Sequence, residues 1–586
     1  MNPLINNVPK TALFIALSTI LAACGGGGGG GGSSAPTTPV QPPVTPPVTP
    51  PVTEPEKPVE PTPGFNAPAG LNGFNPVEAS IADIHAAIQK GTTCEAVVQS
   101  YLDRISGYDK KGPQLNSVIA VNPSALQEAK ALDNLYKQTG QLKGDLHCAT
   151  VLVKDNIDVA GIATTGGSNA LQSNIARDDA YVIKNVKNNG GIILGKANLD
   201  EFAFTFNGVS SHKNGGTTKN AYDLTKTSGG SSSGTATAVS ASFATVGIGS
   251  DAGGSIRVPA ASQGLVGLRP SQRLVSQDGM IPLTPSQDTL GPLCRTTTDC
   301  AVLMDSLIGY DTSATSNQRK QYALNSGLIG SATEYNNSFS VPNTYVNPYA
   351  TLTGMRIGVV NEMYAAANTA EGRLINDAFN QAVAQLRAAG ATVEEVKIND
   401  LNNIFSATYA SLARYEFKNA LTRYLQTTNS TFKSYEALLQ TGQMIPMFSL
   451  YNIDVATANP SIKEFYTRNT TQRGPHVRGS LTTALDSVST AKSYDALAYP
   501  SMVVLASSIG AGPAAGNNNR LSVYSGYPAL SMPAGFVKSP TSVYPMSVNI
   551  EFIAREFDEP TLFNIATAFE KVRGARNVPT HTPRLY

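Results

Sequence analysis

Two glycine- and serine-rich segments that follow each other closely constrain this fold more than any other feature. The first is Ser228–Gly234 and the second is Gly249–Ala260, and small residues dominate the run between them. Glycine permits tight turns, so main-chain N–H groups in such loops can converge on one point. Further upstream, the apolar stretch Val151–Val153 ends at Lys154. The pattern predicts strands that deliver a lysine and two serine-bearing loops to one place, with no histidine required.

Strand and helix signals alternate along the rest of the chain. Repeated units of this kind favour a mixed or parallel sheet with helices on both faces. We therefore expect an α/β fold, with one large domain over residues 73–586 built on a central mixed sheet. Residues 312–353 and 427–479 lack a clear pattern and are expected to be loops or small insertions. Helices are predicted over Pro76–Gly91, Thr92–Tyr108, Pro123–Gln138, Asp179–Asn188, Ala236–Phe243 and Leu374–Ala388, and strands over Ala149–Val153, Gly191–Leu194, Ala244–Ile248, Met355–Val360 and Thr392–Val396.

The composition narrows the range of partners. The chain has 586 residues and is 41% hydrophobic, which is enough for a large core. Its net charge of +1 provides no long-range field for nucleic acid, so we expect no nucleic-acid partner. The five histidines are scattered, with no two of them four positions apart. This argues against a metal site, and we expect no cofactor.

The first 23 residues are typical of an export signal. Lys10 precedes the apolar run Thr11–Ala23, which is too short to cross a bilayer as a mature helix. The run ends in Leu21–Cys24, which resembles the bacterial lipobox, where cleavage before the cysteine is followed by its acylation. We therefore expect a signal peptide over 1–23 and lipidation of Cys24. The alternatives are an ordinary signal peptide cut after Ala23 and an N-terminal anchor.

Residues 24–72 predict a disordered tether. Gly25–Gly32 is an unbroken glycine run, and Pro, Thr and Val dominate the next 31 residues, Ser33–Pro63. Glycine gives a flexible coil, whereas proline gives an extended spacer, and neither contributes a core. We expect an exported bacterial lipoprotein in the periplasm or at the cell surface, touching the membrane only through its anchor. The alternative is a leader with no role.

Four further cysteines leave two alternatives open. In an exported chain an even number of cysteines permits disulfides, and one arrangement pairs Cys94 with Cys148 and Cys294 with Cys300. The other alternative is four buried thiols. The spacing of the cysteines is not that of a metal site.

Ser255 follows two glycines and is the candidate nucleophile. Amide hydrolysis also needs hydrogen-bond donors for the oxyanion that develops on the carbonyl, each worth about 3 to 4 kcal/mol. The N–H groups of Ala252, Gly253, Gly254 and Ser255 are the candidates. Asp251 and Arg257 flank this loop and are expected to brace it.

A nucleophilic serine also needs a proton acceptor. Lys154 can serve if its amine is neutral, which requires a pKa several units below about 10.4. Burial and nearby donors produce such shifts. Ser231 can bridge the two, because a hydroxyl donates and accepts at once.

These segments together resemble the amidase signature family over residues 74–586. The resemblance implies an α/β domain and a Lys–cis-Ser–Ser triad at Lys154, Ser231 and Ser255, with Ser232 in a supporting position. The segments that match the family are Val151–Ser168, Gly195–Asn198, Glu201–Ala203, Ser228–Gly234, Gly249–Ala260, Pro285–Pro292 and Gly526–Leu530.

Two other motifs are rejected. Gly190–Lys196 has Walker A spacing, but its interior is typical of a strand, and Ala197 lacks the hydroxyl that binds magnesium. Gly230–Gly234 matches a nucleophile elbow centred on Ser232, but the preceding residues are polar and no histidine has supporting context.

The sequence therefore predicts an amidase that cleaves a carboxamide through a serine acyl-enzyme. The expected substrates, from the resemblance, are small carboxamides or peptide C-terminal amides. The alternatives are a catalytically idle surface lipoprotein that binds a partner and a tRNA-dependent amidotransferase-like subunit. Loops around Phe204–Ser211 and the stretch after Thr427 are expected to shape the pocket.

Overall fold

The computed structural model describes residues 64–309, 345–486, 493–512 and 516–586. All of them belong to one unit, Val59–Tyr586. The predicted signal peptide (1–23), the lipidation of Cys24 and most of the tether lie outside the described residues and stay predictions. Most of the polar stretch 312–353 lies outside them as well.

The predicted tether, residues 24–72, extends too far along the sequence, because its last residues belong to the folded body. Leu71 is 2% exposed and packs in a core cluster with Ile84 and Val97. The carbonyl of Gly70 accepts a hydrogen bond from the N–H of Thr93 at 3.0 Å. The globular body therefore begins before residue 73, because residues 70 and 71 are already part of its packing.

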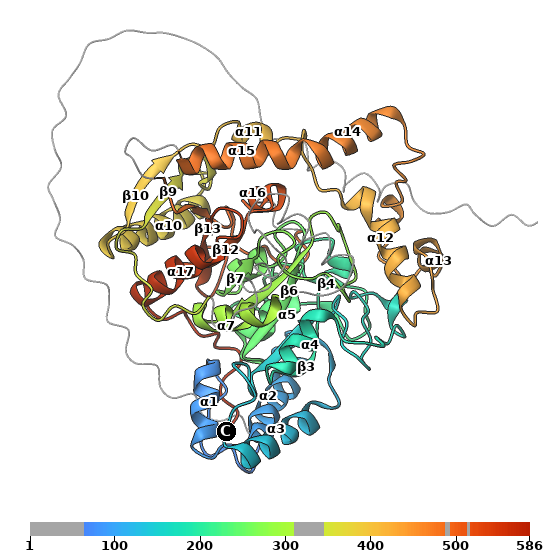
Figure 1. The fold of residues 1–586 in the computed structure, drawn as a ribbon, viewed down its shortest axis with the longest axis vertical. Helices are drawn as coiled ribbons and strands as arrows, with labels where there is room; N and C mark the ends of the chain where they lie inside the picture. Colours follow the sequence, from blue (N-terminus) through green and yellow to red (C-terminus); the bar gives the residue numbers. More distant parts are fainter. Residues whose placement is uncertain (1–63, 310–344, 487–492, 513–515) are drawn as a thin grey trace, which may run out of the picture. The chain divides into compact units, whose positions relative to one another are not determined.

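A mixed sheet organises the body, as predicted (Figure 1). β2 runs parallel to both of its neighbours and β9 runs parallel to both of its own, whereas all other neighbours are antiparallel. Within the described residues the sheet has eleven strands, in the order β1 (Val118–Val121), β3 (Ile192–Ala197), β2 (Thr150–Lys154), β6 (Val246–Asp251), β8 (Thr289–Cys294), β7 (Val266–Arg269), β12 (Ala529–Val537), β13 (Met546–Ile553), β11 (Ala496–Pro500), β9 (Arg356–Val360) and β10 (Thr392–Val396).

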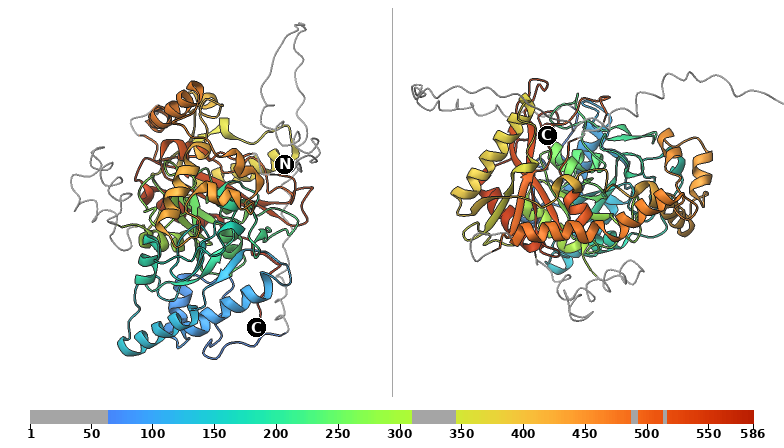
Figure 2. Two further views of the ribbon diagram at one scale, coloured as in Figure 1. Left: turned by 90° about the vertical axis from the view of Figure 1, so that its right-hand side faces the viewer. Right: turned by 90° about the horizontal axis from the view of Figure 1, so that it is seen from above.

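Helices cover both faces of this sheet (Figure 1 and Figure 2). Val151 and Val153 of β2 pack in one apolar cluster with residues of α4, α7, α10 and α17, while Leu152 packs in another with α2, α3 and α5. Because successive side chains of a strand point to opposite faces, β2 is buried on both sides. The helix bounds are α1 (Ile81–Gln89), α2 (Cys94–Tyr108), α3 (Ala125–Thr139), α4 (Tyr181–Asn188), α5 (Ser233–Ser240), α6 (Arg257–Ser262), α7 (Thr297–Leu307), α10 (Ala370–Ala388), α11 (Leu401–Ile404), α12 (Ala413–Thr427), α13 (Tyr435–Gln440), α14 (Pro460–Thr471), α15 (Arg473–Asp486), α16 (Arg520–Ser525) and α17 (Glu559–Arg573).

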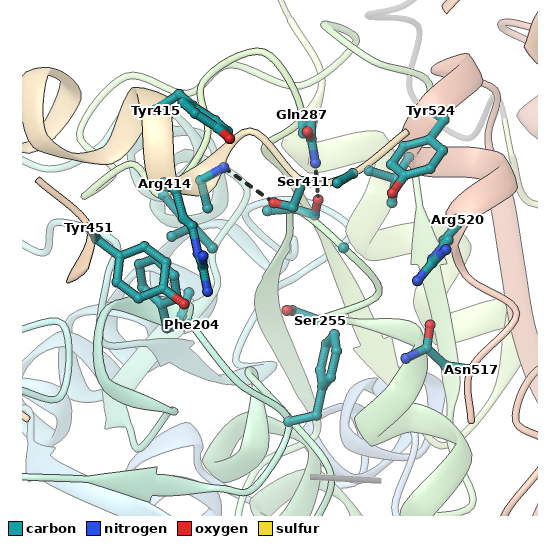
Figure 3. A pocket seen from close by; sticks show the side chains of 18 of the residues that line it. Phe204, Ser255, Gln287, Ser411, Arg414, Tyr415, Tyr451, Asn517, Arg520 and Tyr524 are labelled. Atoms are coloured by element: carbon teal, nitrogen blue, oxygen red, sulfur yellow. Dashed lines mark hydrogen bonds between the residues drawn. The ribbon is translucent and has the colours of Figure 1, made fainter. Parts of the chain in front are cut away.

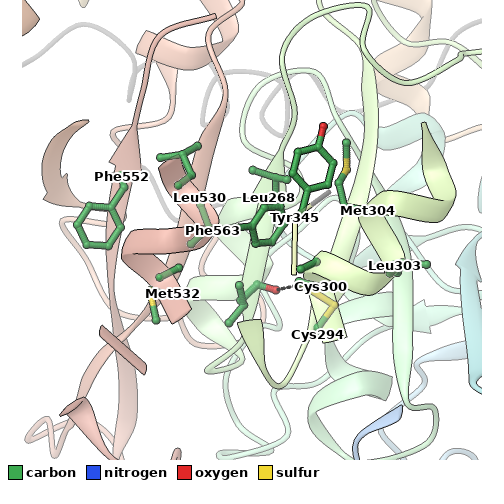
Figure 4. Packing of buried hydrophobic residues seen from close by; sticks show 14 of the residues in the cluster. Leu268, Cys294, Cys300, Leu303, Met304, Tyr345, Leu530, Met532, Phe552 and Phe563 are labelled. Carbon is green, nitrogen blue, oxygen red and sulfur yellow. Dashed lines mark hydrogen bonds between the residues drawn. A yellow bond between two sulfur atoms is a disulfide. The ribbon is translucent and has the colours of Figure 1, made fainter. Parts of the chain in front are cut away.

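The larger apolar cluster joins the middle of the sheet to α7 and α17 (Figure 4). Leu268, Leu530 and Phe552 come from three strands of the sheet, and Phe563 comes from α17. A disulfide between Cys294 and Cys300 is part of this packing. The other disulfide joins Cys94 to Cys148. Of the two alternatives left open by the sequence, the disulfide arrangement is confirmed.

Capping residues set the helix starts and correct several predicted boundaries. α1 begins at Ile81 rather than near Pro76, because Ser80 and Asp83 form a reciprocal capping box. The side chain of Thr93 caps α2 by accepting from the N–H of Ala96. Among the described helices, none has both the length and the apolar character needed to cross a bilayer.

The prediction of irregular structure over 427–479 is wrong, since α13, α14 and part of α15 lie there. Ser434 caps α13, and Asn459 caps α14 with Pro460 at its first position. The apolar period is weak because α14 is largely solvated: Asn469 is its one buried residue in the described structure. The sequence contained the capping residues that mark the start of a helix, but α14 lacked the periodic apolar residues of a helix with one buried face.

Candidate active site

Lys154 is the last residue of β2, and its amine is fully buried. Nζ donates to the hydroxyl Oγ of Ser231 at 2.8 Å and to the Oγ of Ser250 at 2.9 Å. It also lies 3.2 Å from the carbonyl oxygen of Ser250. A strand buried on both faces therefore places this amine within hydrogen-bonding distance of three oxygen atoms of Ser231 and Ser250.

Burial lowers the pKa of Lys154 to about 7, while the carboxylates of Asp200, Asp251 and Asp288 act in the opposite direction. The physical cause is the free-energy cost of placing an ammonium group where water cannot reach it. Near pH 7 a substantial fraction of the molecules therefore carries a neutral amine at this position, which can accept a proton.

Ser231 lies in the first glycine-serine loop, after a cis peptide bond between Gly230 and Ser231. Its carbonyl accepts from the N–H of Asp200 at 3.2 Å. The N–H of Ser232 donates to the carbonyl of Ser255 at 3.1 Å, so the two serine loops are directly hydrogen-bonded. Among the described residues, no hydrogen bond joins the hydroxyls of Ser231 and Ser255. Catalytic hydrogen bonds are often long without substrate and tighten when it binds.

Ser255 is 3% exposed and lies at the wall of a cavity of about 630 Å³ (Figure 3). Ala252 and Gly253 line the same cavity. In Figure 3, Arg414 and Tyr451 lie on one side of Ser255, and Asn517 and Arg520 lie on the other. The structure thus brings the candidate nucleophile to a space large enough for a small organic substrate.

The predicted set of oxyanion donors is corrected at one position. The N–H of Gly254 donates to Oδ1 of Asp251 at 2.7 Å, so it is already occupied. Ala252, Gly253 and Ser255 remain as candidates, and all three line the cavity. The backbone at Gly254 requires glycine, because its φ is +123° and a Cβ atom at this position would lie 2.9 Å from the side chain of Asn519.

Asp251 and Arg257 brace the nucleophile loop from behind, with Glu551 as a third partner. Nε of Arg257 lies 3.2 Å from Oδ2 of Asp251, and its Nη1 lies 2.5 Å from Oε1 of Glu551. Asp251 also accepts from the N–H of Ile256. Although burial opposes it, the charge of Arg257 holds the pKa of Asp251 below its ordinary value. Ser232 adds a bond between its hydroxyl and the carbonyl of Ser250 at 3.2 Å.

Replacing Glu551 by glutamine is expected to destabilise the fold by about 1.5 to 3 kcal/mol, because it removes one of the two carboxylates that bind the buried Arg257 and leaves only Asp251. Denaturant unfolding measures the effect. The control is Glu394→Gln, which removes a more exposed pair with Arg356 and should cost at most about 1 kcal/mol. Equal losses in the two variants would contradict the bracing role.

Several residues of the site were missed by sequence reasoning. Ser250 accepts a hydrogen bond from Lys154. The parallel pairing of β2 with β6 places Val153 opposite Ile248, so Ser250 lies one residue beyond the position opposite Lys154. This strand pairing is the signal that could have identified Ser250. Gln287 holds the nucleophile loop by donating from Nε2 to the carbonyl of Ala252 at 2.8 Å. In the described part of the chain, no group of three or more His, Cys, Asp and Glu side chains could hold a metal ion.

Comparisons with known proteins agree with this geometry. A model of the amidase family matches residues 96–563. A glutamyl-tRNA(Gln) amidotransferase subunit from Lawsonia intracellularis is 31% identical over 533 residues, which cover 87% of this chain and 99% of that protein. The corresponding subunit from Caldanaerobacter subterraneus is 29% identical over 519 residues, covering 82% of this chain and 94% of that protein.

Solved structures with the same fold include the native peptide amidase of Stenotrophomonas maltophilia, with 32% identity and a TM-score of 0.72. The match covers 86% of this chain and 99% of that one. An amidase family protein from Bacillus anthracis has 27% identity and a TM-score of 0.70, covering 86% of this chain and 92% of that one. The chain therefore belongs to the amidase signature family, whose enzymes are hydrolases of amide C–N bonds.

Proposed function

We propose that the protein hydrolyses a carboxamide through an acyl-enzyme on Ser255, with Lys154 as the base and Ser231 as the proton relay. The observation that carries this proposal is the buried amine of Lys154, 2.8 Å from the hydroxyl of Ser231. A buried amine with a pKa near 7 and a hydroxyl partner is suited to moving protons at neutral pH.

In the first half-reaction the Oγ of Ser255 attacks the carbonyl carbon of the substrate. Its proton passes to Ser231, whose own proton passes to the neutral amine of Lys154. Ala252, Gly253 and Ser255 line the cavity, and their N–H groups stabilise the oxyanion. The C–N bond then breaks, and the ammonium of Lys154 returns the proton through Ser231 to the leaving nitrogen.

In the second half-reaction a water molecule attacks the ester carbon on Ser255. Its proton takes the same route through Ser231 to Lys154. The second tetrahedral intermediate collapses, the ester C–O bond breaks, and the proton returns to Oγ of Ser255. The products are a carboxylic acid and the ammonia or amine already released.

Peptide C-terminal amides or small carboxamides are the proposed substrates. A cavity of about 630 Å³ suits ligands of this size. Phe204, Phe206 and Tyr451 line it, so it favours an apolar or aromatic group next to the reacting carbonyl. The similarity to the Stenotrophomonas maltophilia peptide amidase supports the same class.

A fluorophosphonate probe tests for the activated serine. The probe is expected to label the wild-type protein covalently at Ser255, and Ser255→Ala should not be labelled. Absence of labelling in the folded wild-type protein would favour the alternative of a catalytically idle protein that binds a partner. Mass spectrometry of the labelled peptide identifies the modified residue.

The second candidate function is that of a component of a tRNA-dependent amidotransferase, because curated relatives at 28 to 36% identity carry that name. The two functions differ in what the isolated chain does. If the amidase proposal holds, the purified chain alone releases ammonia from a peptide C-terminal amide. Release from glutamine only in the presence of partner subunits would instead favour the amidotransferase.

A further inference from the structure

A second, smaller cavity lies next to the one that contains Ser255. It has a volume of about 210 Å³, and Val523 and Tyr524 line both cavities. Its other walls come from the loop after β7, the adjoining parts of α14 and α15 and the end of α16, together with Ser286, Leu412 and Glu556. Three arginines line it, Arg273, Arg473 and Arg478, against a single acidic residue, Glu556. The cavity is therefore rich in positive charge in a chain whose net charge is only +1.

Arg473 carries a buried charge that has no carboxylate in direct contact, and the charge of Glu416 acts on it only from a distance. The residue is 5% exposed. Its Nη1 donates to the carbonyl of Ala410 at 2.6 Å, and its guanidinium lies 4.5 Å from the ring centre of Tyr524. Its Nε is buried and finds no acceptor among the described residues. Within that part of the chain, no carboxylate lies within 4.0 Å of this side chain.

Arg478 adds a second cation on the same helix. It is partly buried, and its Nη1 donates to the carbonyl of Ser525 at 2.9 Å. Like Arg473, it has no carboxylate partner among the described residues. Two such cations at one cavity repel each other, and burying one of them costs free energy unless an anion compensates.

We propose that this cavity binds a small oxyanion, with the chemistry of a phosphate or a carboxylate group, through Arg473 and Arg478. The planar guanidinium fork matches both groups and binds them through charge-assisted hydrogen bonds. The volume suits a small ion rather than a whole substrate. The bound anion would be separated from the Ser255 cavity by Val523 and Tyr524, so this is a site distinct from the one that holds the scissile amide.

Binding is measured with the full chain by thermal unfolding and isothermal titration, using inorganic phosphate as the probe. Phosphate is expected to raise Tm by a few degrees in a saturable way, because it binds the folded state only. Sodium chloride of equal ionic strength should not reproduce the rise. Succinate in a parallel titration distinguishes the two sources of the anion: tighter binding of succinate than of phosphate indicates a carboxylate ligand.

Two variants locate the site, and a third is the control. Arg478→Gln and Arg473→Leu are each expected to weaken binding at least about tenfold. Arg473→Leu should keep or raise Tm in the absence of phosphate, because it removes a buried charge that makes no direct ion pair among the described residues. Arg520→Gln changes an arginine of the neighbouring cavity and should leave phosphate affinity as in the wild type.

Three results would overturn the proposal: no saturable phosphate effect beyond chloride, equal loss of binding in Arg520→Gln, or unchanged binding in both cavity variants. None of these measurements needs amidase activity. Failure of the anion site is therefore distinguishable from failure of the proposed function.

Discussion

Replacing Ser255 by alanine is expected to reduce amide turnover by about four to six orders of magnitude. The reason is that Oγ of Ser255 forms the covalent bond to the acyl group, and alanine has no atom that can form it. Release of ammonia from a peptide C-terminal amide measures the rate. The folded state should be unaffected, since the hydroxyl lies at the cavity wall rather than in the packed core.

A matched control separates this loss from general damage to the pocket. Ser411 also lines the cavity, but it lies on the segment before α12 and contacts neither Lys154 nor Ser231. Ser411→Ala should retain most of the wild-type rate. If Ser255→Ala kept a rate comparable to that of Ser411→Ala, the acyl-enzyme mechanism would be refuted.

The positions of Lys154 and Ser231 were predictable, because each follows closely on a recognisable strand or loop signal in the sequence. A buried apolar strand ending in a lysine, followed by two glycine-serine loops, has few arrangements in a parallel sheet. The structure accordingly brings Lys154 and Ser231 to 2.8 Å, although they are 77 positions apart. The mixed sheet and the helices on both faces were predictable for the same reason, because apolar strands and amphipathic helices alternate in this region.

The cavity walls were predictable in part. Phe204, Phe206 and Tyr451 line the cavity and lie in the two stretches that were expected to shape it. Arg414 and Arg520 lie outside those stretches and reach the cavity only through tertiary packing. Helix α14 buries little, so its sequence lacks the apolar period that normally identifies a helix. The hydrogen bond from Gly254 to Asp251 also depends on the turn geometry of one loop. A glycine-rich sequence indicates that main-chain N–H groups can converge on one point, but it does not show which of them already donate to other groups of the protein.

The rate of hydrolysis is expected to rise with pH through about 7 on the acid side, because the neutral form of Lys154 accepts the proton. A plot of kcat/KM against pH measures this limb. The same group affects stability. Its folded-state pKa, about 7, lies below the ordinary value of 10.5, so between these values the unfolded chain binds more protons than the folded one. Stability from this group therefore rises with pH over that window, by up to about 1.4 kcal/mol per pH unit.

Two substitutions separate the proton-accepting role of Lys154 from its charge. Lys154→Arg keeps a cation but cannot lose a proton in the pH range of the assay, so it should be inactive at every pH. Lys154→Met removes the titrating group, so it should be inactive as well and should lack the rise in stability between about pH 7 and 10.5. An active Lys154→Arg enzyme would show that the position needs only positive charge. In that case Ser231 would have to pass its proton elsewhere, and a lysine base could no longer explain why this amine is buried without a carboxylate in direct contact.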